Sequence, residues 1–173
     1  MIRGITEMLT IFGENEFKPL IRYRTEIPGQ LIAEDGRIFS VQTQKFRSPF
    51  KSWTYSATGE RTIRCLSVTC NIPAGYFPDY TFRKKNESDN HERINIAVHR
   101  AVMETWRPID DYPPIPKEDW DMCPESAKQW IRDTAFVDHI DDDPTNNHVD
   151  NLRWVVPKEN QAHRKKHDKN SQD

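Results

Sequence analysis

Apolar and polar residues alternate over short runs in the first third of the chain, and polar turns separate these runs. The stretch GQLIAEDGRIFSVQT is broken at Glu34-Asp35-Gly36, and an Asp-Gly pair between two apolar runs is typical of a β-hairpin. We therefore predict strands from Phe17 to about Arg64.

The spacing of apolar residues changes twice in the middle of the chain. Residues 83–93 are strongly polar and predict a turn, INIAV (94–98) predicts a short strand, and HRAVMETW (99–106) predicts a helix because its apolar residues fall at helical spacing. Five prolines in residues 107–126 exclude a regular element over most of that stretch, which we interpret as a linker or a covering loop. A short helix is expected from Glu125 to Asp133.

The last third has a compact order of elements. Phe136 and Val137 lead a strand into Asp138-His139, and a polar loop of about twelve residues follows. LRWVV (152–156) predicts a second strand, and Pro157 stands at a favourable first position for a helix. We therefore predict an α+β fold with an N-terminal segment (1–16), a β-rich module (17–92), a second module (93–168) that contains a proline-rich acidic insertion (107–130), and a tail (169–173).

Composition argues against a membrane protein and a disulfide scaffold. A mean hydropathy of -0.87, with no apolar run near the roughly 18 residues of a membrane span, indicates a soluble protein. The first residues lack a cleavable signal pattern, so we expect a cytoplasmic location. Cys65, Cys70 and Cys123 form an odd set without a Cys-x-x-Cys pair, which favours buried thiols. A zinc ion held by Cys65, Cys70 and a histidine stays an alternative with little support from the spacing.

The net charge of -2 hides a segregation of charge along the chain. Residues 1–102 carry 15 Lys and Arg against 11 Asp and Glu, residues 103–150 carry 4 against 13, and residues 151–173 carry 6 against 3. Basic ends around an acidic middle are typical of a protein that binds phosphates at two places, although ordinary solvated faces give the same counts.

One basic stretch is interleaved with aromatic residues. The segment KFRSPFKSWTYSATGERTIR combines positive charge with rings that stack on bases or form the core of a small β-module. We predict that this segment contacts DNA through Lys45, Arg47, Lys51, Arg61 and Arg64.

The strand-loop-strand-helix segment carries four polar residues at defined places: Asp138, His139, Asn151 and Asn160. The shared motifs are VHRAV (98–102), VDHIDDDPTNN (137–147), NLRWV (151–155) and EN (159–160). Together they resemble the HNH homing endonucleases of phage introns and intergenic regions, and IPGQLIAEDGRIFSV is similar to the small DNA-binding module that often precedes such nuclease domains. The resemblance covers about two thirds of the chain and implies a ββα-metal nuclease that acts on double-stranded DNA without a small-molecule cofactor.

Each residue type suits a step of phosphodiester cleavage, which needs a nucleophile and neutralisation of the charge that develops on the phosphate. A histidine titrates near neutral pH, so we assign His139 as the base that takes a proton from water. Asp138 points to the other face of its strand and offers a hard oxygen ligand to one Mg²⁺ or Mn²⁺ ion. The resemblance implies that Asn160 binds the same ion, and that Asn151 fixes the loop and orients His139 by hydrogen bonding.

Neighbouring residues leave alternatives open. For His163 three roles are open: an alternative metal ligand, a phosphate contact or a solvated helix residue. Arg153 alternates away from Trp154, which we place in the core, and is expected to face the phosphate. His99 is expected to be a structural histidine with satisfied hydrogen bonds. Phosphate contacts are also expected from Arg164, Lys165 and Lys166.

The sequence departs from the family pattern in three places. Asp142 stands where a glycine is frequent, but aspartate tolerates the left-handed conformation better than most residues. Val156 replaces the frequent Ser or Thr before Pro157 and forfeits a helix cap worth about 1 kcal/mol. The third departure is the acidic insertion before Phe136. Asp141, Asp142 and Asp143 resemble a metal cluster, but we interpret this loop as solvated.

The sequence as a whole predicts a site-directed DNA endonuclease. It would bind duplex DNA with its N-terminal module and cleave one strand or both strands with its C-terminal site. It would act as a monomer or a homodimer. One alternative is a DNA-binding protein with an inactive nuclease site, against which the intact motif argues. Another is a nuclease with a restriction, packaging, toxin or regulatory role.

Overall fold

The computed structural model describes residues 16–55, 58–80, 82–84 and 90–157. Its strands are β1 (Phe17–Arg22), β2 (Thr25–Ala33), β3 (Ile38–Ser40), β4 (Lys45–Phe46), β5 (Phe50–Tyr55), β6 (Arg61–Pro73), β7 (Arg83–Lys84), β8 (His91–Ala97), β9 (Phe136–His139) and β10 (Leu152–Val155). Its helices are α2 (Val98–Trp106), α3 (Lys117–Met122), α4 (Glu125–Thr134) and the short 3-10 helix η1 (Val149–Asn151). The mixture of strands and helices confirms the predicted α+β class.

The N-terminal sheet is antiparallel, in the order β1-β2-β3-β4. Strands β2 and β3 pair at Ile32 and Ile38, so residues 34–36 close the hairpin that the Asp-Gly signal predicted. Gly36 has a φ of 85°, a conformation that glycine adopts without steric cost. Ile32 and Ile38 are fully buried, and this face of the hairpin therefore contributes to the core.

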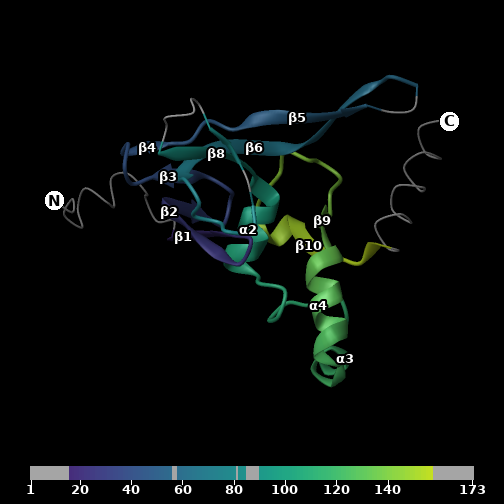
Figure 1. Cartoon of the computed structure of the whole chain (residues 1–173). Coiled ribbons are helices and arrows are strands. Elements are labelled where there is room, and N and C mark those ends of the chain that lie inside the picture. The colour runs from purple at the N-terminus through teal and green to yellow at the C-terminus, as the bar shows by residue number, and fades with distance from the viewer. Residues whose placement is uncertain (1–15, 56–57, 81, 85–89, 158–173) are drawn as a thin grey trace.

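The second sheet has the order β5-β6-β8-β7, and its β5–β6 hairpin extends beyond the body of the molecule (Figure 1). Alternate residues of β6 point to opposite faces, so Cys70 lies in the core while Cys65 lies on the other face. These two thiols are buried as predicted, but Cys123 is only half-buried. Cys65 and Cys70 therefore do not form a shared zinc site.

Strand β8 begins at His91, earlier than the sequence pattern predicted. The polar stretch at 83–93 was interpreted as a turn, but its last residues pair with β6, with Glu92 opposite Ile72. Charged residues are compatible with this strand because alternate side chains, such as His91 and Arg93, point to solvent.

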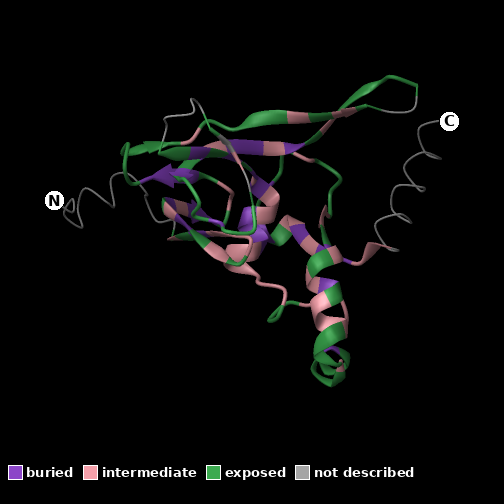
Figure 2. Cartoon of the chain, in the orientation of Figure 1, coloured by how far each residue is buried: buried purple, intermediate pink, exposed green. Residues whose placement is uncertain are grey.

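Helix α2 lies at the centre of the fold, where Figure 2 shows the buried residues concentrated. Val98, Ala101, Val102 and Met103 are buried on it. The same cluster of buried residues includes β1, β2, β6, β8 and β10, so the two predicted modules share one hydrophobic core. This shared core fixes the N-terminal sheet relative to the β9–β10 strand pair.

The proline-rich insertion contains a helix, α3, that the prolines led us not to expect. Pro113, Pro114 and Pro116 all precede its first turn, where a missing backbone N–H costs nothing. Trp120 on α3 is buried, and α4 follows as predicted. Together α3 and α4 project from the body of the molecule (Figure 1).

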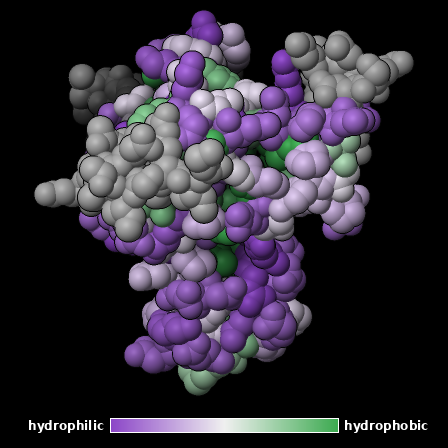
Figure 3. All heavy atoms as spheres, turned by 90° about the vertical axis from the view of Figure 1, so that its left-hand side faces the viewer, coloured by the Kyte–Doolittle hydropathy of each residue, from purple (hydrophilic) through white to green (hydrophobic). Residues whose placement is uncertain are grey.

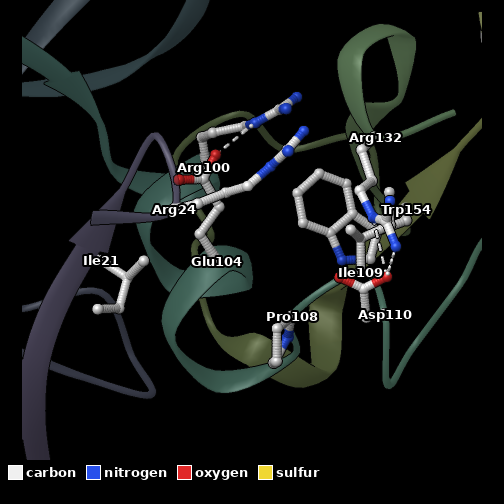
Figure 4. A pocket seen from close by; sticks show the side chains of 9 residues that line it. All are labelled: Ile21, Arg24, Arg100, Glu104, Pro108, Ile109, Asp110, Arg132 and Trp154. Atoms are coloured by element: carbon white, nitrogen blue, oxygen red, sulfur yellow. Dashed lines mark hydrogen bonds and ion pairs between the residues drawn. The ribbon is translucent and has the colours of Figure 1, made fainter. Parts of the chain in front are cut away.

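The insertion covers the side of β10 that carries Trp154. The indole Nε1 of Trp154 donates to the carbonyl of Arg107 at 2.8 Å, and Asp110 accepts from Arg132 of α4 at 2.6 Å. A pocket of about 220 Å³ remains between α2 and the insertion (Figure 4). Within its lining Arg100 pairs with Glu104 and Arg132 with Asp110, while Arg24 pairs with Asp133 of α4. The third departure from the family pattern is therefore a folded cover rather than a loose linker, and Trp154 is buried as predicted.

Hydrophilic residues dominate the face drawn in Figure 3, where apolar residues appear only in small patches. No helix in the described part of the chain has the length and apolar character needed to cross a membrane.

Candidate active site

Strands β9 and β10 form an antiparallel pair that places Asp138 opposite Arg153 and His139 opposite Leu152. Arg153 donates to the Oδ2 atom of Asp138 from Nε at 2.9 Å and from Nη2 at 2.7 Å. The Asp138 side chain is 14% exposed and that of Arg153 is 40% exposed, so the pair lies at the edge of the site. Arg153, which we expected to face a phosphate, is thus already engaged with the carboxylate beside it.

The loop between the strands is held by Asn151, at the end of η1. Its Nδ2 donates to Asp141 Oδ1 at 2.8 Å and to the Asn146 carbonyl at 2.9 Å, while its Oδ1 accepts from the Asp141 amide at 3.1 Å. Asn146 Nδ2 also donates to Asp141 Oδ2 at 2.7 Å. These donors, first Asn146 and then Asn151, hold the pKa of the Asp141 carboxyl below its usual range.

The run of aspartates is exposed and organises the loop through local hydrogen bonds. Asp143 accepts from the amide and the hydroxyl of Thr145 at 2.8 and 2.7 Å, and both bonds lower its pKa. Asp142 has a φ of 63°, which is the left-handed conformation that its place in the pattern predicted.

The ring of His139 is held by Asn147, a residue that the sequence reasoning missed. His139 Nε2 and Asn147 Oδ1 are 3.2 Å apart, and Asn147 Nδ2 donates to the Thr145 carbonyl at 3.1 Å. Because that second bond fixes which end of the amide carries the hydrogens, the Asn147 oxygen faces His139 and must accept from Nε2–H. The His139 Nδ1 atom is then the one that can take a proton.

Asn147 is 5% exposed, whereas the neighbouring Asn146 is exposed. We expected Asn151 to orient His139 directly, but its hydrogen bonds go to the loop. A pair of adjacent asparagines in the loop was the available signal, yet the sequence alone does not say which of them turns inward.

His99, at the start of α2, lies against the ring of His139, with ring centroids 5.2 Å apart. Burial of the His99 ring, followed by the nearby positive charge of protonated His139, lowers its pKa to about 3. Within the described residues, the buried Nδ1 of His99 has no hydrogen-bond partner, so the expectation of a fully satisfied structural histidine is wrong. His99 is an uncharged ring against which His139 packs.

The predicted metal ligands are only partly described. No cluster of three or more His, Cys, Asp or Glu side chains able to hold a metal exists among the described residues. The two hydrogen bonds that Arg153 donates to Asp138 end on Oδ2, so a cation contact would use Oδ1. A single carboxylate oxygen of this kind fits Mg²⁺ or Mn²⁺, which keep several waters of their own. Outside the described residues lie Asn160, His163, Arg164, Lys165, Lys166 and the body of the predicted helix after Pro157.

A groove of about 780 Å³ runs from His99 and β9 to the β5–β6 hairpin. Arg22, Arg64 and Arg100 line it, and Arg22 and Arg100 both bond to Glu104 Oε1 at 2.7 and 3.0 Å. Arg64 comes from the hairpin and is exposed, so it adds positive charge to the groove wall.

The other predicted DNA contacts are divided between two surfaces. Lys51 and Arg61 are exposed on the hairpin, where the Arg61 guanidinium lies 3.9 Å from the centre of the Trp53 ring. Lys45 is exposed on β4, and Arg47 is half-buried because it donates to Gln30 Oε1 at 3.0 Å. Arg64, Lys51 and Arg61 therefore all belong to the hairpin, but only Arg64 lines the groove. Lys51 and Arg61 lie on the opposite face of the hairpin, and Lys45 and Arg47 lie outside it.

Comparison with known proteins identifies the segment that contains this site. Residues 112–162, less than a third of the chain, match the model of the HNH endonuclease family. A search of curated proteins found no match. One solved structure, described as "DNA binding and cleavage by the HNH homing endonuclease I-HmuI", aligns with a TM-score of 0.43 and 17% sequence identity. The alignment covers 88% of this chain and 59% of that one, so the chain spans about three fifths of that protein's length.

Proposed function

We propose, from the HNH endonuclease domain that the chain carries at residues 112–162, that this protein hydrolyses phosphodiester bonds in double-stranded DNA. The observation that carries the proposal is the geometry of His139. Its Nε2–H is bound to Asn147, so Nδ1 is left to accept a proton from an attacking water. Asp138 lies next to it in the sequence and at the edge of the same strand pair.

In this mechanism His139 acts as the general base and Asn147 keeps the ring in one tautomer. Asn151 holds the loop that carries Asn147, and Arg153 fixes the Asp138 carboxylate. Asp138 and Asn160 would hold one Mg²⁺ or Mn²⁺ ion, which neutralises charge that develops on the phosphate and on the departing 3′ oxygen.

The DNA is proposed to lie along the groove, with the β5–β6 hairpin as a second contact. Arg64 contributes charge from the groove wall, and Lys51 and Arg61 contribute charge from the exposed hairpin. Trp53 and Tyr55 are 38% and 67% exposed on the same hairpin, which allows their rings to pack against sugars or bases. The positive residues 164–166 would extend these contacts to a second stretch of backbone.

We further propose that cleavage is site-directed, as in homing endonucleases. One active site per chain favours a nick by a monomer, whereas a homodimer would cut both strands. The experiment is cleavage of supercoiled and linear DNA with Mg²⁺ or Mn²⁺, followed by mapping of the ends. One preferred long site supports homing, and many short sites indicate a restriction-like or packaging nuclease.

The metal assignment has its own test. Asp138→Ala and Asn160→Ala should each weaken cleavage and raise the Mn²⁺ concentration needed for half-maximal rate. Asp111→Ala, at an exposed carboxylate of the insertion outside the proposed ligand set, serves as the control. Unchanged metal dependence in the Asp138 variant would remove Asp138 from the ligand set.

A further inference from the structure

We propose that the β2–β3 turn of the N-terminal sheet positions the catalytic histidine, because Gly36 of this turn sets the place of Asn147. The inference rests on the proposed function, since it concerns how His139 is held for its role as base. It assigns to the N-terminal module a part in catalysis, in addition to the DNA binding predicted for it.

The β2–β3 turn is in direct contact with the loop between β9 and β10, which carries Asn147. A Cβ atom at Gly36 would lie 2.8 Å from Val98 Cγ1 and 3.1 Å from Asn147 Cβ, and the first distance is too short for real atoms. The amide of Val149 also donates to the Glu34 carbonyl at 2.8 Å, which ties the turn to the same loop by a backbone hydrogen bond. The turn and Asn147 therefore move together.

The two residues that touch Gly36 lead to both sides of the His139 ring. Asn147 accepts from His139 Nε2 at 3.2 Å. Val98 precedes His99, whose ring centroid is 5.2 Å from that of His139. A glycine at this turn thus allows the close approach that brings the hydrogen-bonding partner and the packing partner of His139 together.

The position of Asn147 matters because it decides which nitrogen of His139 carries the proton. The amide oxygen of Asn147 stabilises the Nε2–H tautomer and directs Nδ1 away from itself. If a new Cβ at residue 36 displaces Asn147, the ring loses both its preferred tautomer and its orientation. A small displacement of a catalytic group is known to cost up to about 100-fold in rate.

The test compares Gly36→Ala with Gly75→Ala. Both glycines have positive φ, 85° and 73°, so alanine strains the backbone at either position. A Cβ at Gly75 would meet no atom of the described residues within 4 Å. This variant therefore measures the cost of backbone strain without a steric clash against Asn147. Both variants carry the intact Asn147, His99 and His139.

Two measurements are made on the full chain. The first is the ¹⁵N chemical shift pair of the His139 imidazole in metal-free protein, at a pH well above the ordinary histidine pKa, with the signals assigned by comparison with His139→Gln. The second is plasmid cleavage, with kcat and KM separated. We expect Gly36→Ala to lose the Nε2–H preference and to lower kcat about 10- to 100-fold while KM changes little. Gly75→Ala should keep the wild-type imidazole signals and kcat.

Identical imidazole shifts and identical kcat in the two variants would overturn the proposal. If Gly36→Ala fails to fold, the double variant Gly36→Ala with Val98→Ala removes the shorter clash and keeps the contact with Asn147, and the same outcomes decide. Absence of any cleavage by the wild-type protein would contradict the proposed function instead, and the imidazole shifts would still decide this inference.

Discussion

Gly36 and Gly59 lie in the turns of two hairpins and have nearly the same φ values, 85° and 83°. Their surroundings differ completely. A Cβ at Gly36 would lie 2.8 Å from Val98 Cγ1 and 3.1 Å from Asn147 Cβ, whereas one at Gly59 would meet no atom of the described residues within 4 Å. The first hairpin turns inward against the loop that carries Asn147. The second extends from the body (Figure 1) and carries exposed aromatic and basic residues.

The same local feature, a glycine with positive φ, therefore occurs in two turns that have different roles. A glycine with positive φ only permits a tight turn. What the turn does is decided by residues far away in the sequence, which either pack against it, as Asn147 does, or leave it in solvent. We therefore expect the inward hairpin to affect the rate of catalysis, and the outward hairpin to affect the affinity for DNA.

The largest effect is expected at the inward contact. Asn147→Ala removes the acceptor of His139 Nε2–H and should lower kcat about 10- to 100-fold with little change in DNA affinity. Asn147→Asp retains an oxygen acceptor and should recover part of the rate. Asn71→Ala, on the exposed edge of β6, is the matched control. Equal rates for Asn147→Ala and Asn71→Ala would show that the inward contact is not catalytic.

A pH effect on stability is expected from His99. Its neighbour Val98 is the residue that packs against the turn at Gly36. The His99 pKa is lowered from 6.5 to about 3 in the folded protein. Below pH 6.5 the unfolded chain binds a proton that the folded chain excludes, so the free energy of unfolding should fall as the pH drops from 6.5 towards 3. His99→Phe should flatten this part of the profile in denaturant titrations. An equally steep fall in His99→Phe would assign the effect to other groups.

A smaller effect, on affinity alone, is expected at the outward hairpin. Substitution of Lys51 and Arg64 by alanine should weaken DNA binding and reduce the slope of log K against log salt by about 0.9 for each phosphate that is no longer neutralised. The charge-matched double variant Lys117→Ala with Lys128→Ala lies on α3 and α4. DNA affinity is measured by fluorescence titration at several salt concentrations, and this control should bind like the wild type. A similar drop in affinity in both double variants would show that Lys51 and Arg64 contribute only general positive charge.

The smallest effect is expected from Gly59→Ala. The strain of alanine at positive φ should cost about 1–2 kcal/mol of stability. Because nothing contacts the new Cβ, kcat should stay at the wild-type value. A thermal melt measures the stability and a cleavage assay measures kcat. A decrease in kcat as large as that of Gly36→Ala would contradict the claim that only the inward hairpin affects catalysis.

The features that could be predicted from the sequence depend on local patterns. The turn at Glu34-Asp35-Gly36, the left-handed Asp142 and the strand that carries Asp138 and His139 all follow from residues close to one another. The match to the HNH endonuclease family over residues 112–162 confirms the resemblance for the nuclease segment.

The features that could not be predicted depend on packing between distant segments. Asn147 was not distinguished from Asn146 because only the folded loop decides which of them turns towards His139. The contact between Gly36 and Asn147 joins residues that are far apart in the sequence, and the spacing of residues along the chain does not predict it. The start of strand β8 was placed too late because its first residues are charged, and only their pairing with β6 makes them a strand. The short helix α3 was not predicted because the prolines before it give no sign of the packing of Trp120.

The most direct test of the central claim is metal-dependent nicking of supercoiled plasmid by the wild type and by His139→Ala, with DNA binding measured in parallel. We predict that the wild type nicks the plasmid, and that His139→Ala binds DNA with the same affinity but cleaves about 100-fold more slowly or worse. Cleavage by His139→Ala at the wild-type rate, or no cleavage by the wild type with either Mg²⁺ or Mn²⁺, would contradict the role of His139 as the base of a DNA endonuclease.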